Sequence, residues 1–79
     1  MKFTVYSKDG CPFCVQVKQV LEIADFEHVV YTLDRDFTRE EFYTQFGSGS
    51  TFPQVVLNDL ERLGGCTDTV RYLKENNLV

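Results

Sequence analysis

Two cysteines three residues apart, in the segment C-P-F-C over residues 11–14, stand where a strand-like run gives way to a helical pattern. Residues 2–7 are rich in β-branched and aromatic side chains and predict a strand, and residues 8–10 predict a turn. Apolar residues then recur at three- and four-residue spacing to about residue 25, which predicts an amphipathic helix. Pro12 suits its first position, where a missing N–H costs nothing. The two thiols are therefore expected at the start of a helix that directly follows a strand.

The start of a helix leaves backbone N–H groups unpaired and carries a partial positive charge. Such a site favours a thiolate, the reactive form in thiol–disulfide exchange, and C-x-x-C beside a βαβ pattern is typical of thioredoxin-like redox chemistry. Cys11 is expected to be the more exposed sulfur and the nucleophile, and Cys14 the resolving thiol. A four-ligand metal site would need two further Cys or His residues. Only Cys66 and His28 remain, in other segments, so a redox pair and no metal is predicted.

The composition limits the other classes of function. A chain of 79 residues predicts one domain over residues 1–79. The net charge is −4 and the eight Lys and Arg residues form no basic run, which argues against nucleic acid as a partner. No apolar run approaches the roughly 18 residues of a membrane span. An odd count of three cysteines argues against a secreted disulfide framework, and the N-terminus reads as a strand rather than a signal peptide. We therefore expect a reducing, cytoplasmic setting.

Three further strands are predicted along the chain. Residues 28–33 are β-branched and aromatic, residues 54–57 form a short apolar run, and a turn at residues 58–59 leads into a strand that ends near residue 63. Because right-handed crossovers join parallel strands, the first two strands are expected to be parallel.

Two more helices are predicted. Thr38 opens a capping-box pattern, Phe42 and Phe46 form a buried stripe, and Gly47 is placed to end this helix. Thr67 is the expected N-cap of the last helix. The order βαβαββα predicts an α/β fold with a four-stranded mixed sheet and helices on both faces.

Four motifs together resemble those of the glutaredoxins, the small glutathione-dependent branch of the thioredoxin superfamily. In order they are Lys8-x-x-Cys11, C-P-F-C over residues 11–14, T-F-P over residues 51–53, and G-G-C-T-D over residues 64–68. The resemblance covers nearly the whole chain and implies a thioredoxin-like fold. It also implies a dithiol enzyme that reduces protein disulfides and glutathione mixed disulfides, with glutathione as reductant and no bound prosthetic group. Cys11 would attack the substrate and Cys14 would resolve the mixed disulfide.

The resemblance further implies a glutathione-binding groove. Pro53 would be cis and would leave the backbone of Phe52 free to pair with an extended peptide. Amides at the start of the last helix would accept the γ-glutamyl carboxylate, and Asp68 would pair with the ammonium group. Lys8 would meet the glycyl carboxylate, while Phe13 would form an apolar wall. The expected binding residues are Lys8, Phe13, Thr51, Phe52, Pro53, Gly65, Cys66, Thr67, Asp68 and Arg39.

This sequence departs from the family pattern at several of these positions. Most glutaredoxins have Val in place of Phe52 and more often Tyr in place of Phe13, and many have Arg before the T-F-P position, where Ser50 stands here. Arg39 is an interpretation of where the missing positive charge comes from; a solvated residue at a helix start is the alternative. Cys66 is expected to bind through its backbone. The Phe52 departure predicts an altered substrate preference with unchanged chemistry.

The resemblance makes disulfide-containing or glutathionylated proteins the expected partners, with ribonucleotide reductase as one such client, and a monomer is expected. Two alternatives remain open. One is a redoxin of the same fold that takes electrons from thioredoxin reductase, against which the G-G-C-T-D segment argues. The other is an iron–sulfur carrier in which two chains share a cluster through Cys11 and glutathione. Pro12 and Cys14 argue against the second alternative.

Overall fold

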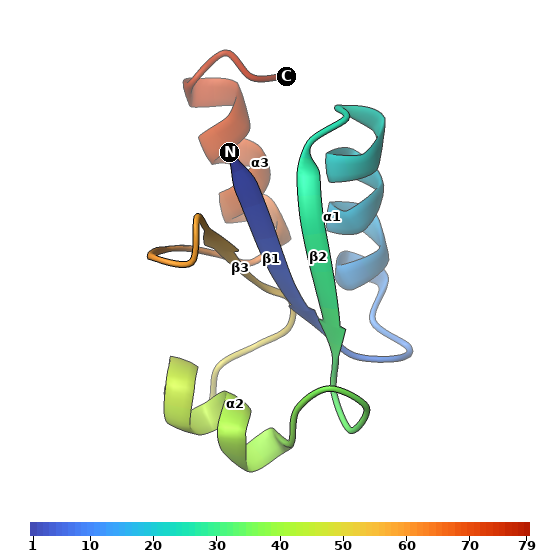
Figure 1. Ribbon diagram of the computed structural model, residues 1–79, viewed down its shortest axis with the longest axis vertical. Coiled ribbons are helices and arrows are strands. Elements are labelled where there is room, and N and C mark those ends of the chain that lie inside the picture. Colours follow the sequence, from blue (N-terminus) through green and yellow to red (C-terminus); the bar gives the residue numbers. More distant parts are fainter.

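The computed structural model describes all 79 residues and contains four strands and three helices in the predicted order. The elements are β1 (Lys2–Ser7), α1 (Pro12–Ile23), β2 (Glu27–Thr32), α2 (Arg39–Phe46), β3 (Gln54–Leu57), β4 (Glu61–Gly64) and α3 (Cys66–Glu75). The strands form one sheet in the order β2-β1-β3-β4 (Figure 1). β1 is parallel to β2 and antiparallel to β3, so the predicted mixed sheet is confirmed.

The register of the sheet places the chain's functional segments side by side. β1 pairs with β3 so that Tyr6 lies opposite Gln54, and β3 pairs with β4 so that Val55 lies opposite Gly64. The loop that leaves β1 toward the cysteines therefore lies beside the loop that enters β3. The end of β4, from which α3 begins, completes the same edge of the sheet.

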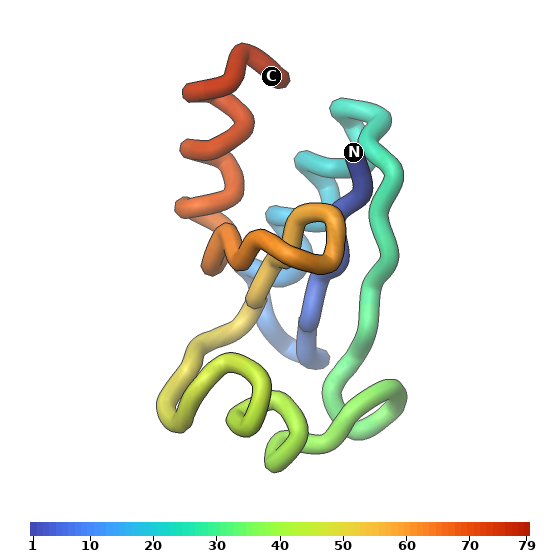
Figure 2. Tube along the Cα trace, turned by 60° about the vertical axis from the view of Figure 1, so that its left-hand side comes forward, coloured from blue at the N-terminus to red at the C-terminus, as the bar shows by residue number.

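The helices cover the two faces of the sheet unequally. Figure 1 shows α1 and α3 together behind the sheet, while α2 lies at the end of the sheet away from the two termini, as it does in Figure 2. The side chains of Phe3 and Val5 point into the core that α1 and α3 enclose, where Leu21 and Leu73 are fully buried. Tyr6 lies on the opposite face because side chains alternate along a strand. Its ring packs edge-to-face on Phe46 of α2, 5.0 Å between centroids.

The capping box at the start of α2 is confirmed. The Glu41 N–H donates to the Thr38 hydroxyl at 3.1 Å, and the Thr38 N–H donates to the Glu41 carboxylate at 2.8 Å. Gly47 ends the helix at a φ of 102°, as expected. Phe42 is 2% exposed, whereas Phe46 is only half-buried.

The expected N-cap of α3 is wrong by two residues. The helix begins at Cys66 with Gly65 as N-cap, so Thr67 lies exposed in the first turn. The Asp68 carboxylate accepts a hydrogen bond from the Gly65 N–H at 3.4 Å, while the Thr69 N–H donates to the Gly65 carbonyl at 3.0 Å. The helix starts two residues earlier than expected because the Asp68 carboxylate in its first turn accepts the free N–H of Gly65. The Thr67 hydroxyl does not cap the helix.

None of the three helices combines the length and the apolar character that crossing a bilayer requires.

Candidate active site

The two thiols of the C-P-F-C segment lie at the start of α1, as predicted. Cys11 is the N-cap of the helix, and its Sγ accepts a hydrogen bond from the Cys14 N–H at 3.2 Å. Pro12 occupies the first helical position. The Cys11 side chain is 7% exposed and that of Cys14 is 0% exposed, so Cys11 is the sulfur nearer to solvent. A backbone donor and the positive end of a helix both favour negative charge on Cys11.

Cys14 has the opposite environment. Burial raises the pKa of its thiol from 9.0 to about 12, and its hydrogen bond to Cys11 adds to the effect. At neutral pH Cys14 therefore keeps its proton. Burial also raises the pKa of Cys66, and the charge of Cys11 contributes to this rise. All three cysteines are free thiols.

The T-F-P segment forms the loop that enters β3. The Phe52–Pro53 peptide bond is cis, as the resemblance implied, and Pro53 is buried. The Gln54 side-chain amide donates to the Thr51 carbonyl at 2.9 Å and closes the loop. No hydrogen bond within the protein uses the backbone N–H or carbonyl of Phe52. This leaves a free backbone edge of the kind that an extended peptide can pair with.

The G-G-C-T-D segment joins β4 to α3. Gly64 has a φ of +104°, and a Cβ at this position would lie 2.6 Å from the Asp68 carboxylate. The Asp68 carboxylate also accepts from the Arg71 guanidinium at 3.4 Å, with both side chains exposed. The N–H groups of Cys66 and Thr67 lie in the first turn of α3, where a helix provides no partner for them. Free donors and one carboxylate thus lie side by side.

These segments enclose a groove of about 250 Å³. It is lined by Phe13, Thr51, Phe52, Pro53, Gln54, Gly64, Gly65, Cys66, Thr67 and Asp68. Eight of the ten binding residues predicted from the sequence therefore come together. Gln54 lies outside the predicted set, and Gly64 was predicted as part of the G-G-C-T-D motif but not as one of the ten binding residues. The antiparallel pairing of β1 and β3 brings Gln54 to the groove, and a strand partner is not visible in a local motif.

The other two predicted residues lie elsewhere. Lys8 does not line the groove itself. Its ammonium lies 5.3 Å from the centroid of the Phe52 ring, and Phe52 does line the groove. Arg39 does not line the groove; its guanidinium donates to the Tyr43 hydroxyl one turn along α2 at 3.4 Å.

A cluster of aromatic rings continues from the groove into α2. Phe52 stacks on Phe42 with ring centroids 4.1 Å apart and planes 11° apart. Phe37, in the loop before α2, stacks on both rings at 5.8 and 6.2 Å. The helical spacing of Phe42 and Phe46 is visible in the sequence. The stack of Phe37, Phe42 and Phe52 is not, because these residues come from three separate segments.

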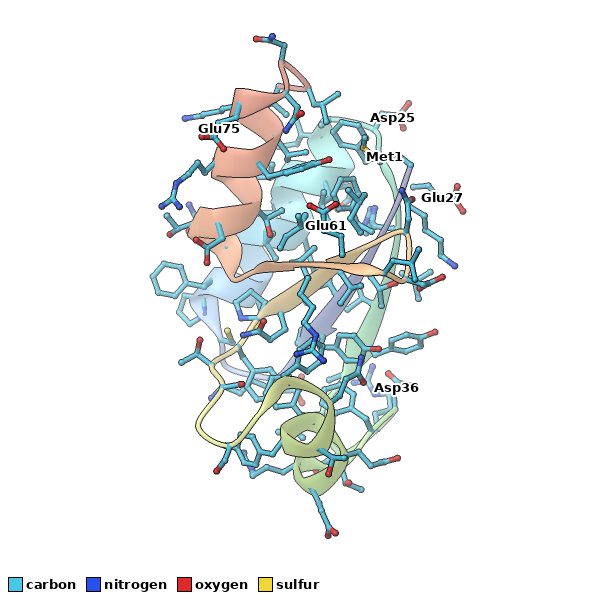
Figure 3. All side chains as sticks on the ribbon, turned by 90° about the vertical axis from the view of Figure 1, so that its left-hand side faces the viewer. Met1, Asp25, Glu27, Asp36, Glu61 and Glu75 are labelled. Carbon is cyan, nitrogen blue, oxygen red and sulfur yellow. The ribbon has the colours of Figure 1, made fainter.

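Charged side chains are distributed over the surface. The labelled acidic residues in Figure 3 are all exposed: Asp25, Glu27, Asp36, Glu61 and Glu75. No group of three or more His, Cys, Asp or Glu side chains is arranged to hold a metal ion.

A dithiol segment at a helix start that lines one groove, through Phe13, with a cis-proline loop on a mixed four-stranded sheet is typical of a thiol–disulfide oxidoreductase with the thioredoxin-like fold. A family model described as glutaredoxin matches residues 3–60. This chain belongs to the glutaredoxin family, whose members are thiol–disulfide oxidoreductases. It is 35% identical over 78 residues to Glutaredoxin-C6 of Oryza sativa subsp. japonica, covering 95% of this chain and 69% of that protein. It is 29% identical to Glutaredoxin 1 of Escherichia coli, covering 96% of each.

Solved structures agree with this assignment. The fold matches that of reduced Escherichia coli glutaredoxin with a TM-score of 0.81 at 26% identity, covering 100% of both chains. It matches Glutaredoxin 1 of Francisella tularensis with a TM-score of 0.78 at 28% identity, covering 98% of this chain and 95% of that one. The fold class predicted from the sequence is confirmed.

Proposed function

We propose that this chain is a glutathione-dependent oxidoreductase that reduces protein disulfides and glutathione mixed disulfides through the Cys11–Cys14 dithiol. The observation that carries the proposal is the groove, because it joins a free backbone edge at Phe52 to the free donors at the start of α3. Cys11 lies next to it, since Phe13 lines the groove and the charge of Cys11 acts on Cys66.

The chemistry of the groove suits a γ-glutamyl tripeptide. The first-turn N–H groups of Cys66 and Thr67 can donate to the α-carboxylate, and Asp68 can pair with the adjacent ammonium group. The Phe52 backbone can pair with the cysteinyl residue, which places its sulfur toward Cys11. The Lys8 ammonium can pair with the glycyl carboxylate at the other end of the tripeptide.

Reduction of a disulfide then proceeds in two exchanges. The Cys11 thiolate attacks one substrate sulfur, the substrate S–S bond breaks, and the second substrate sulfur leaves as a thiolate that takes up a proton. Cys14 then loses its proton and attacks the Cys11 sulfur, which releases the first substrate sulfur as a thiol. Two electrons have passed from the dithiol to the substrate, and Cys11 and Cys14 are joined in a disulfide.

Two glutathione molecules restore the dithiol. The first attacks Cys11, breaks the disulfide and leaves glutathionyl-Cys11 with a free Cys14 thiol. The second attacks the glutathione sulfur of this adduct, which yields oxidised glutathione and the Cys11 thiolate. Removal of glutathione from a protein needs only Cys11, because the adduct that forms is the same glutathionyl-Cys11.

The proposal also covers the cellular compartment, the protein substrates and the oligomeric state. A dithiol that cycles needs a reducing compartment, for which we infer the cytoplasm. Protein disulfides and glutathionylated proteins are the proposed substrates, and ribonucleotide reductase is the proposed client among them. We propose that the chain acts as a monomer, since each residue of the proposed cycle lies on one chain.

The roles of the two cysteines can be separated by trapping. Cys14→Ser treated with oxidised glutathione should accumulate one glutathionyl adduct on Cys11, detected by mass spectrometry, because the resolving thiol is missing. This variant should still remove glutathione from a mixed disulfide but should lose reduction of protein disulfides. Cys11→Ser should lose both activities.

Retained activity in Cys11→Ser would contradict the assignment of the nucleophile. A dithiol that oxidised glutathione leaves unmodified, but that thioredoxin reductase reduces, would replace the proposed reductant.

A further inference from the structure

The Phe52 side chain is held more firmly than its place in a loop suggests. Its ring lies 4.1 Å from that of Phe42, with the planes 11° apart. Phe42 is 2% exposed and belongs to α2, so the stack fixes the Phe52 ring to a helix on the other side of the loop. Phe37 also stacks on this ring, with centroids 6.2 Å apart, so the Phe52 ring is packed within the aromatic cluster while Phe52 lines the groove.

Lys8 lies over the same ring. Its ammonium lies 5.3 Å from the Phe52 centroid, within the range of a cation–π interaction. No carboxylate lies within ion-pair distance of Lys8, because the single salt bridge in the structure joins Arg71 to Asp68. The Phe52 ring is thus the side-chain partner that the structure gives this cation.

We propose that Phe52 is a positioning residue whose ring holds the Lys8 ammonium ready for a substrate carboxylate. This inference rests on the proposed function, since the carboxylate in question is that of glutathione. A free lysine side chain loses rotamer entropy when it engages a ligand, and a side chain already held in place loses less. A π-face attracts the cation without using its N–H donors, so all three stay available to the carboxylate.

The proposal predicts an energetic coupling between the two residues. Phe52→Leu keeps an apolar side chain but removes the ring face, so KM for a glutathionylated peptide should rise about two- to fivefold, with a smaller change in kcat. Lys8→Met should raise KM as well. In the Lys8→Met background, Phe52→Leu should add little, because the cation that the ring positions is gone. Phe52→Tyr should restore the wild-type KM.

The matched control is Phe46→Leu. Phe46 also packs on Phe42, at 5.0 Å, and has its own cation, with Arg62 at 5.2 Å from its centroid, but it does not line the groove. Its replacement should leave KM unchanged. Additive effects of Phe52→Leu and Lys8→Met would overturn the proposal. An equal rise of KM in Phe46→Leu would overturn it too, because general loosening of the aromatic cluster would then explain the loss.

A spectroscopic measurement tests the contact without any substrate. In the wild-type protein the ε-methylene protons of Lys8 should be shifted upfield in the NMR spectrum by the Phe52 ring current, and Phe52→Leu should remove the shift. An unshifted signal in the wild-type protein would refute the contact, even in an active enzyme. A shifted signal in a protein that fails to turn over glutathione mixed disulfides would refute the proposed function and, with it, the carboxylate role of Lys8.

Discussion

Cys11 and Cys14 are the same residue type three positions apart, yet their hydrogen bonding and their depth in the protein differ. Cys11 lies outside the first turn of α1, where it accepts a backbone N–H, and Cys14 lies inside the turn with no exposed surface. A nucleophile needs the first environment and a resolving thiol the second, because Cys14 must stay protonated until a mixed disulfide has formed. The burial that raises the pKa of Cys14 therefore favours the proposed order, in which Cys11 reacts first.

The raised pKa values predict how the stability of the reduced protein depends on pH. The pKa of Cys14 is raised by burial and by its hydrogen bond to Cys11, from 9.0 to about 12, so folding favours the protonated thiol. Its contribution to stability is fully present below the unfolded-state pKa and is lost as pH rises through the folded-state value. The free energy of unfolding in urea should thus be flat near neutral pH and should fall above about pH 9.

Other groups titrate in the same range, so the measurement needs a variant without this thiol. Cys14→Ala removes the titrating group from a fully buried position and should show a shallower fall with pH than the wild-type protein. Parallel curves for the two proteins would contradict the assignment of this pH dependence to Cys14.

At the scale of elements, the junction of β4 and α3 depends on the absence of a side chain at Gly64. Gly64→Ala would place a Cβ 2.6 Å from the Asp68 carboxylate, at a φ of +104° that L residues rarely adopt. The strain should cost about 1–3 kcal/mol of unfolding free energy. Displacement of the Asp68 carboxylate should also raise KM for glutathionylated substrates. Urea unfolding and steady-state kinetics measure the two effects.

Gly49→Ala separates the effect of backbone strain from the effect of displacing the Asp68 carboxylate. Gly49 has a φ of +84°, but a Cβ there would meet nothing within 4 Å. It should lose stability through its backbone alone and keep its KM. An equal rise of KM in both variants would show that the higher KM of Gly64→Ala does not come from displacement of the Asp68 carboxylate.

Elements defined by local signals were predictable from the sequence. The capping box of Thr38 and Glu41 is complete within four residues, and the β-branched and aromatic run of β1 is visible in six. The N-cap of α3 was not predictable in the same way, because Gly65 lacks a side chain and its N–H is satisfied by Asp68. A polar Thr67 hydroxyl is the stronger local signal, and tertiary context overrode it.

At the scale of the whole molecule, the sheet register assembles the site. β1 is central, and its pairing with β3 and of β3 with β4 aligns three loops at one edge. Motif spacing indicated that these loops belong together, and eight of the ten predicted binding residues line one groove. Arg39 and the Phe42–Phe52 stack depend instead on where α2 lies across the sheet, which no local pattern encodes.

The stability of the site depends on the core beneath it, and α1 offers a matched pair of residues to test this. Leu21 is fully buried between α1 and the sheet, whereas Ile23, two residues further along the same helix, is 86% exposed. Truncating a buried leucine removes its transfer free energy and leaves a cavity, at a cost of about 2–5 kcal/mol. A domain of this size has only about 0.05–0.15 kcal/mol of stability per residue. Leu21→Ala should therefore lose a large share of the unfolding free energy and lower Tm markedly.

Ile23→Ala removes the same number of carbon atoms from the same helix as Leu21→Ala but takes no atom from the core, so its free energy of unfolding should change by less than about 0.5 kcal/mol. Thermal unfolding followed by circular dichroism measures both variants. Cys14 lies on the helix that Leu21 anchors and is fully buried, so protection of the Cys14 thiol from alkylation should fall together with the stability of Leu21→Ala. Equal stability of the two variants would show that α1 is not held by this core.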